Sequence, residues 1–195
     1  MTIVTALRPT PAGVVVELDG VVWRTLPVDA VVDAGLGVGL VLDRARAVAL
    51  ARARRRSRAD DVAVRALARR EHSRTTLDAR LARAGVGATV RRETVERAER
   101  RGLVDDRRFA VQRAQHLAGR GAGDALVRDD LARQGIDEPV ARSIVAELEP
   151  EAERAARIVA ARGRSPRTIR YLASKGFSEE TLEPYIAEIE NGALG

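Results

Sequence analysis

One six-residue phrase, Leu-Ala-x-x-Gly followed by an apolar residue, occurs three times in the last two-thirds of the chain. The copies are Leu81–Val86, Leu131–Ile136 and Leu172–Phe177. A glycine at the end of a helix adopts the left-handed conformation without a Cβ penalty, so the next apolar residue can fold back on the last turn. Three copies predict a series of similar helical units, and such series commonly present a binding surface.

Apolar residues at equivalent positions extend the repeat beyond the phrase. An aliphatic residue lies fourteen positions before each leading leucine, at Leu67, Leu117 and Ile158. Further apolar residues follow at spacings of three and four, which is typical of one buried face of a helix. We therefore expect three units of three helices each. The expected helices are 59–72, 74–84 and 88–101, then 104–118, 123–134 and 138–148, then 151–162, 166–175 and 179–190.

Cap residues agree with these helix boundaries. Ser73, Asp137 and Ser178 stand where the N-terminus of a helix needs a side-chain acceptor for its unpaired amides. Pro139 and Pro166 occupy first-turn positions, where proline is tolerated. Alanine-rich helices can resemble one another by chance, but the shared step from glycine to an apolar residue argues against that alternative.

The front of the chain carries strand signals instead. Two valine-rich segments, 12–18 and 21–26, flank Asp19-Gly20, which is a strong signal for a β-hairpin. Residues 2–7 predict a third strand that ends before Pro9. A small β-rich region therefore precedes the helical units.

These patterns together predict a mainly α fold class. Three tandem three-helix repeats should form an elongated, curved array, and a small β-rich N-terminal domain with its own helices should precede it. The expected helices of that domain span 28–34 and 42–56. The expected divisions are 1–58 for the β-rich extension and 59–102, 103–149 and 150–195 for the three repeats.

The sequence contains no recognisable pattern of a nucleotide-binding, metal-binding or covalent active site. The glycine-rich segment 35–39 lacks the Gly-Lys-Ser/Thr of a phosphate loop and the spacing of a dinucleotide fingerprint. There is no cysteine, and His72 and His116 are not spaced as a ligand pair. No serine, histidine and acid set can be assembled. We expect no enzymatic activity, no cofactor and no metal.

The adjacent carboxylates Asp105 and Asp106 are the candidate catalytic pair of this sequence. A catalytic pair would need a pocket and a second group with a shifted pKa. An aspartate pair in the first turn of a helix is better explained by capping and by the helix dipole. We therefore expect a structural role for this pair.

The net charge of +6 is concentrated in the first half of the chain. Five arginines cluster between Arg52 and Arg58 at the end of the expected helix. Such a cluster attracts nucleic acid through counterion release, and it is also typical of a solvated helix end. Both interpretations stay open. No aromatic residues interleave with these arginines, so a platform for stacking single-stranded bases is not expected.

Three segments of the chain carry motifs of one known family. They are Ala66–Arg74 with Leu77, Leu81, Gly85 and Val86 after it, then Gly102–Ala110 with the phrase Gly-x-x-Asp-Asp-x-x-Phe-Ala, and then residues 171–178. These segments resemble the RecX family of bacterial recombination regulators: the first is similar to the first repeat of that family, the second to its most specific phrase, and the third also fits. The resemblance covers roughly residues 59–190. The segment Gly119–Asp124 departs from the family pattern, because it holds one arginine and an aspartate where basic residues are usual.

The resemblance implies a regulatory protein that binds the RecA recombinase or the RecA–DNA filament. It implies that the protein mainly inhibits filament growth, strand exchange, ATP hydrolysis and co-protease activity. We expect a cytoplasmic protein, because no signal peptide or long apolar run is visible. We also expect a monomer. Contact with single-stranded or duplex DNA should be weak and non-specific.

The exposed basic residues of the first half are the expected contacts with the partner or with DNA. They are Arg54, Arg55, Arg56, Arg58, Arg65, Arg69, Arg70 and Arg74. An alternative is a protein that binds DNA directly through helix-turn-helix-like units. A third, weaker possibility is that residues 1–58 form a small SH3-like adaptor.

Overall fold

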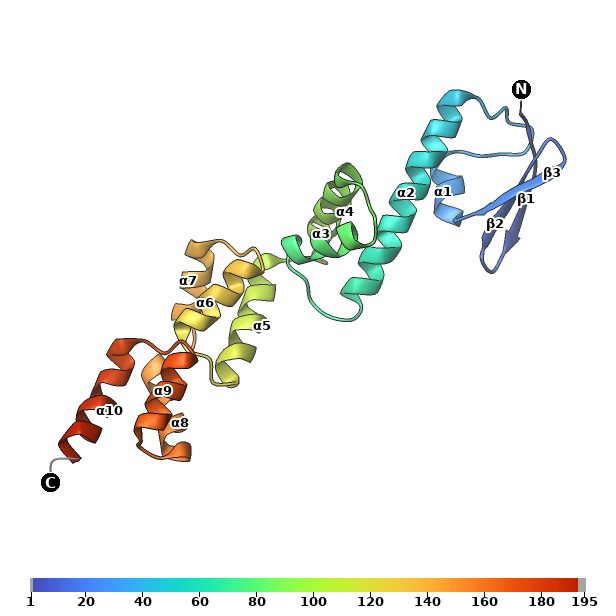
Figure 1. Ribbon diagram of the computed structural model, residues 1–195. Coiled ribbons are helices and arrows are strands. Elements are labelled where there is room, and N and C mark those ends of the chain that lie inside the picture. The colour runs from blue at the N-terminus through green and yellow to red at the C-terminus, as the bar shows by residue number, and fades with distance from the viewer. Residues whose placement is uncertain (1, 193–195) are drawn as a thin grey trace. The chain divides into compact units, whose positions relative to one another are not determined.

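The computed structural model describes residues 2–192, and the chain divides into two compact units (Figure 1). Unit 1 holds the residues up to Arg70 together with Leu77–Arg101. Unit 2 holds Glu71–Thr76 together with the residues from Gly102 onward. The chain is mainly helical, with a small sheet near its N-terminus, as the sequence predicts.

Unit 1 begins with an antiparallel sheet of three strands in the order β1-β2-β3. The strands are β1 (Val4–Thr10), β2 (Gly13–Leu18) and β3 (Val21–Leu26). Asp19 and Gly20 form the predicted turn between β2 and β3, with φ of 50° and 83°. The expected end of the first strand before Pro9 is wrong, since Pro9 pairs with Val14 inside β1. β1 is an edge strand, where a residue without an amide donor is tolerated.

Two helices pack against this sheet, α1 (Val28–Asp33) and the N-terminal half of α2 (Arg44–Leu67). The core between the sheet and these helices consists of valine and leucine side chains. Each strand and helix contributes to it, and β3 does so through Leu26. Its buried members are Val4, Val14, Val16, Leu26, Val31 and Leu50. Burial of such side chains is the main stabilising contribution in a small sheet-and-helix unit.

The 24-residue helix α2 corrects one sequence prediction. A break near residue 57 and a domain boundary after residue 58 were expected, but α2 runs through both positions. No glycine or proline occurs between Arg44 and Leu67 to stop the helix. The buried side changes along its length: Leu50 and Ala53 belong to the N-terminal half, and Ala59 and Ala63 to the half that packs on α4. In Figure 1, α2 accordingly lies between the sheet and α3 and α4.

Two shorter helices complete unit 1. They are α3 (Arg74–Arg83), which enters this unit at Leu77, and α4 (Ala88–Arg100). Leu77 and Leu81 are completely buried, as the apolar periodicity predicts. The first repeat as predicted therefore shares its leading helix with the N-terminal sheet.

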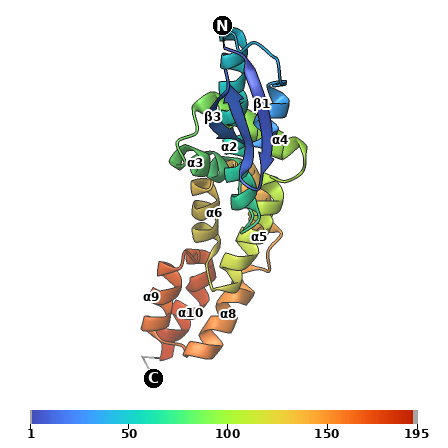
Figure 2. The same ribbon diagram turned by 90° about the vertical axis from the view of Figure 1, so that its right-hand side faces the viewer.

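Unit 2 contains two groups of three helices. Figures 1 and 2 show this unit from two sides. The first group is α5 (Asp106–Gly119), α6 (Asp124–Arg133) and α7 (Glu138–Ala146). The second group is α8 (Glu151–Arg162), α9 (Pro166–Ser174) and α10 (Glu179–Gly192). Each group has its own apolar core, one around Leu131 and Ile144 and the other around Leu172 and Phe177. The helix bounds agree closely with those expected, whereas the elongated, curved array of tandem repeats stays a prediction.

The repeated phrase ends a helix in the same way each time. Gly85, Gly135 and Gly176 have φ of 76°, 80° and 81°. The amide of the next apolar residue donates to the carbonyl of the leading leucine, at 3.1, 3.0 and 3.2 Å in the three copies. This bond is the one expected for a left-handed helix end.

Two of the three predicted N-caps are confirmed. The hydroxyl of Ser73 accepts from the amide of Thr76 at 3.1 Å, and that of Ser178 accepts from the amide of Thr181 at 3.3 Å. The prediction for Asp137 is wrong, because this residue occupies the N-cap position without a side-chain cap.

Candidate functional site

The helix α2 brings three of the expected contact arginines to one cleft of unit 1. Arg54, Arg55 and Arg58 line a cleft of about 450 Å³ together with Thr25, Pro27, Ala51 and Asp61. Their guanidinium groups outnumber the single carboxylate of the lining. Arginine forks onto carboxylates and phosphates alike, so this surface suits an acidic protein segment or a phosphate backbone.

The spacing along α2 places these arginines. Arg54, Arg58 and Arg65 follow one another at intervals of four and seven, which is one face of a helix. The buried positions of α2 are mostly small: Ala53, Ser57, Ala59, Ala63 and Ala66, with Leu50. The small buried residues therefore leave the long cationic side chains on the outside.

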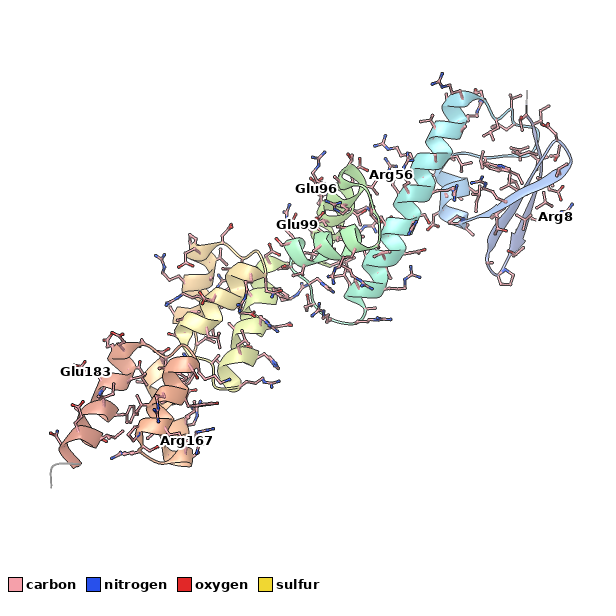
Figure 3. All side chains as sticks on the ribbon, in the orientation of Figure 1. Arg8, Arg56, Glu96, Glu99, Arg167 and Glu183 are labelled. Atoms are coloured by element: carbon pink, nitrogen blue, oxygen red, sulfur yellow. The ribbon has the colours of Figure 1, made fainter. Side chains whose placement is uncertain are left out.

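Arg56 does not belong to the exposed set. It lies on α2 (Figure 3), and its Nε is 3.5 Å from Glu93 of α4, which also pairs with Arg52 at 3.2 Å. The Nε donor of Arg56 is buried and makes no hydrogen bond within the part of the chain that the structure describes. This arginine ties α2 to α4 and is a weaker candidate for partner contact than its neighbours.

Arg58 has a structural contact as well as a place in the cleft. Its Nη2 donates to the carbonyl of Ala84 at 3.1 Å, next to the phrase glycine Gly85. In the other two copies the equivalent carbonyl accepts from the hydroxyl of Ser73 at 2.7 Å and from the amide of Gly123 at 2.8 Å. Three different donors therefore satisfy the same carbonyl position.

The remaining expected contacts are spread over the end of α2 and the loop after it. Arg65 is exposed in the last turn, and Arg69 and Arg70 are exposed beyond it. Within residues 2–192 these three side chains have no hydrogen-bond or ion-pair partner. Arg74 lies in unit 2, where its amide donates to Asp106 at 2.8 Å. The structure thus brings together Arg54, Arg55 and Arg58, and it does not gather all eight.

The Asp105-Asp106 pair caps two different helices. Asp105 accepts from the amide of Arg108 at 2.9 Å and so caps its own helix, α5. Asp106 accepts from the amide of Arg74, the first residue of α3. This arrangement confirms the capping interpretation.

A bidentate ion pair near this cap was not foreseen from the sequence. Arg108 donates to both carboxylate oxygens of Glu71, at 3.2 and 3.1 Å. The hydrogen bond to Glu71 raises the pKa of Arg108 above its ordinary value. Glu71 and Arg108 are 37 positions apart, and no local pattern connects them.

A second junction, between the two helix groups of unit 2, also depends on charged residues. Glu151 of α8 accepts from the amides of Asp124 and Ser178, at 2.6 and 3.0 Å. Burial raises the pKa of this carboxyl, but the hydrogen bonds from Ser178, Asp124 and Thr181 outweigh burial and leave it below its ordinary value. The first turn of α8 thus caps the N-termini of both α6 and α10.

Arg154 is the buried centre of that junction, with 3% of its surface exposed. It donates to the carbonyl of Ala122, to the carboxylate of Asp124 and, at 3.0 Å, to the carbonyl of Glu149. A buried guanidinium is tolerated where such acceptors surround it. Sequence analysis missed this residue, because an arginine in an alanine-rich helix gives no signal of burial.

No group of three or more histidine, cysteine or acidic side chains that could hold a metal occurs in the described part of the chain. Across residues 2–192 there is also no helix with the length and apolar character needed to cross a membrane.

Comparison with known proteins adds information that the geometry does not contain. No family model matches the chain. It is 34% identical over 136 residues to the regulatory protein RecX of Chromohalobacter salexigens, covering 65% of this chain and 90% of that protein. It is also 34% identical over 142 residues to RecX of Syntrophotalea carbinolica, covering 65% of this chain and 92% of that protein.

Solved structures agree on the fold. A crystal structure of a regulatory protein RecX matches with a TM-score of 0.76 at 18% identity, covering 94% of this chain and 98% of that one. RecX from Lactobacillus salivarius matches with a TM-score of 0.59 at 16% identity, covering 70% and 97%. With the sequence relatives, which exceed 30% identity over most of their own length, the conclusion is that this chain belongs to the RecX family of regulatory proteins.

Proposed function

We propose that this protein binds the RecA recombinase, or its filament on DNA, and mainly inhibits filament growth. Slower strand exchange, ATP hydrolysis and co-protease activity would follow from a shorter filament. The observation that carries the proposal is the 34% identity to proteins named regulatory protein RecX over at least 90% of their length. The protein would act in the cytoplasm as a monomer and without catalysis of its own.

The cleft of unit 1 is the proposed contact surface. Arg54, Arg55 and Arg58 offer several guanidinium groups around one carboxylate, Asp61. A surface of this kind favours an acidic partner and accelerates its approach through long-range attraction. Arg65, Arg69 and Arg70 are exposed further along the chain and would widen that surface.

The test is RecA-driven ATP hydrolysis on single-stranded DNA, with filament disassembly followed in parallel. We expect the purified protein to slow hydrolysis at substoichiometric amounts. Unchanged hydrolysis at equimolar protein would contradict the proposal. Replacing Arg54, Arg55 and Arg58 together by glutamine should weaken inhibition about tenfold, if the substitutions remove about 1.4 kcal/mol of binding free energy.

A matched control separates this surface from net charge. Arg92, Arg100 and Arg101 are also exposed arginines of unit 1 but do not line the cleft. Their triple replacement by glutamine changes the charge equally and should leave inhibition nearly unchanged. Equal losses in both triple variants would show that the cleft is not the contact surface.

Direct DNA binding is the second candidate, and the same exposed arginines favour it. It predicts binding to naked duplex DNA. The binding constant should fall by about 0.9 logarithmic units per phosphate contacted for each tenfold increase in salt concentration. Inhibition of RecA without measurable duplex binding would decide for the first function, and tight duplex binding without inhibition would decide for the second.

A further inference from the structure

A second basic cleft lies within unit 2, although the net charge of that half of the sequence is nearly zero. It has a volume of about 370 Å³ and lies between the end of α5 and the outer side of α8 and α9. Its lining includes Arg120, Arg157, Ile158, Arg162 and Tyr171. The lining residues, from Ala118 to Tyr171, are up to 53 positions apart, so no short sequence window contains the site.

The lining holds four arginines and no carboxylate. Two of them are neutralised from outside the cleft: Arg157 by both oxygens of Glu149, and Arg154 by Asp124. Arg120 and Arg162 have no carboxylate partner within residues 2–192. Two guanidinium groups therefore face the cleft with their charge uncompensated.

An aromatic ring fixes one of these cations. The guanidinium carbon of Arg162 lies 4.0 Å from the centre of the Tyr171 ring, and the Lys175 ammonium lies 5.6 Å from it. A cation over a ring face gains electrostatic attraction and loses freedom. Ile158 and Ala161 add an apolar wall beside the ring. The cleft thus combines a preorganised cation with an apolar surface.

We propose that this cleft of unit 2 binds a phosphate ester of nucleotide size. Guanidinium groups fork onto phosphate oxygens with paired, charge-assisted hydrogen bonds. The absence of a carboxylate from the lining removes the repulsion that a dianion would otherwise meet. The apolar wall suits the uncharged part of the ester, which inorganic phosphate lacks. The proposal does not rest on a RecA-directed function, because it concerns the isolated protein.

The test uses the full chain and the double variant Arg120→Gln with Arg162→Gln. The probes are a short fluorescein-labelled oligothymidylate, followed by anisotropy, and thymidine 5′-monophosphate as competitor. The double variant should bind the strand about tenfold more weakly or worse. The slope of log binding constant against log salt concentration should become shallower by about 1.4. This is about 0.7 for each of the two single-strand phosphates that the removed guanidinium groups no longer neutralise.

The control is the double variant Arg167→Gln with Arg170→Gln. These two arginines are exposed on α9, lie outside the cleft and carry the same charge; Figure 3 labels Arg167. Equal binding by the two double variants would overturn the proposal, provided that both unfold at the same temperature as the parent. Competition by the mononucleotide would assign the site to a single ester. Strand binding without such competition, still abolished in the Arg120 and Arg162 variant, would assign it to consecutive phosphodiesters.

Discussion

The first copy of the repeated phrase and the two later copies share a backbone but differ in what surrounds them. A Cβ atom on Gly85, in unit 1, would have open space around it. A Cβ on Gly176, in unit 2, would lie 2.6 Å from the amide nitrogen and 2.8 Å from the Cβ of Leu126, and one on Gly135 would overlap Thr75. The same residue therefore ends a helix in unit 1, whereas in unit 2 it also permits close approach of another helix.

Arginine differs between the units in a parallel way. In unit 1 most arginines of α2 are exposed, and Arg54, Arg55 and Arg58 line an open cleft. In unit 2 Arg154, Arg113 and Arg108 each hold a carboxylate that comes from a distant part of the chain. The comparison shows that some arginines of this chain line open clefts, whereas others join distant segments, as Arg56 of unit 1 also does through Glu93.

The largest expected difference between the units comes from removing Arg154. Arg154→Met should lower the free energy of unfolding by about 3 kcal/mol, because the substitution leaves Asp124 and the Ala122 carbonyl without their donor. The exposed control, Arg65→Met, should change it by no more than about 0.5 kcal/mol. The measurement is urea unfolding followed by far-ultraviolet circular dichroism, with Trp23 fluorescence reporting on unit 1 alone. Equal losses in the two variants would break the comparison.

Replacing the phrase glycines should give a smaller difference. Both Gly85→Ala and Gly176→Ala place a Cβ in the left-handed region, at φ of 76° and 81°, which costs each variant about 1 kcal/mol. Gly176→Ala should cost about 1 kcal/mol more, because Leu126 must move away. Thermal unfolding of both variants checks this expectation. If Gly85→Ala proves the more destabilising change, the contact at Leu126 has no energetic consequence.

The smallest expected effect is a dependence of stability on acid within unit 2. Arg113 donates to both oxygens of Asp130, at 2.7 and 2.9 Å, and this holds the pKa of the carboxyl below its ordinary value. The ion pair therefore stabilises the fold above about pH 4, the ordinary pKa range of aspartate. That stabilisation disappears as the pH falls from there through the lowered pKa of the folded state.

Asp130→Asn should accordingly cost about 1 kcal/mol at neutral pH and flatten the loss of stability below about pH 4. Asp129→Asn is the control, since Asp129 is the exposed neighbour on the same helix. Urea unfolding at a series of pH values gives both quantities. An acid profile of Asp130→Asn that overlays the parent's would assign the acid sensitivity to other carboxylates.

The helices could be predicted well because their signals are local. Glycine, serine and proline punctuation set the ends of α3 to α10 to within a few residues, and the Asp19-Gly20 turn set the register of the hairpin. The same kind of reasoning placed a break near residue 57, inside α2. The helix packs on α1 and on α4, and these packing partners depend on elements far away in the sequence.

The candidate sites show the same difference between local sequence signals and long-range packing. The sequence by itself determined the family, the helical punctuation and the exposed arginines of α2, because each depends on residues close together in the chain. Only the tertiary structure decided which arginines are buried and which face a cleft. Arg154 meets Asp124 thirty positions away, and Arg120 joins Arg162 and Tyr171 from a different helix group. A guanidinium can reach water or be buried beside an acceptor, and the neighbours that choose between these states are brought by the fold.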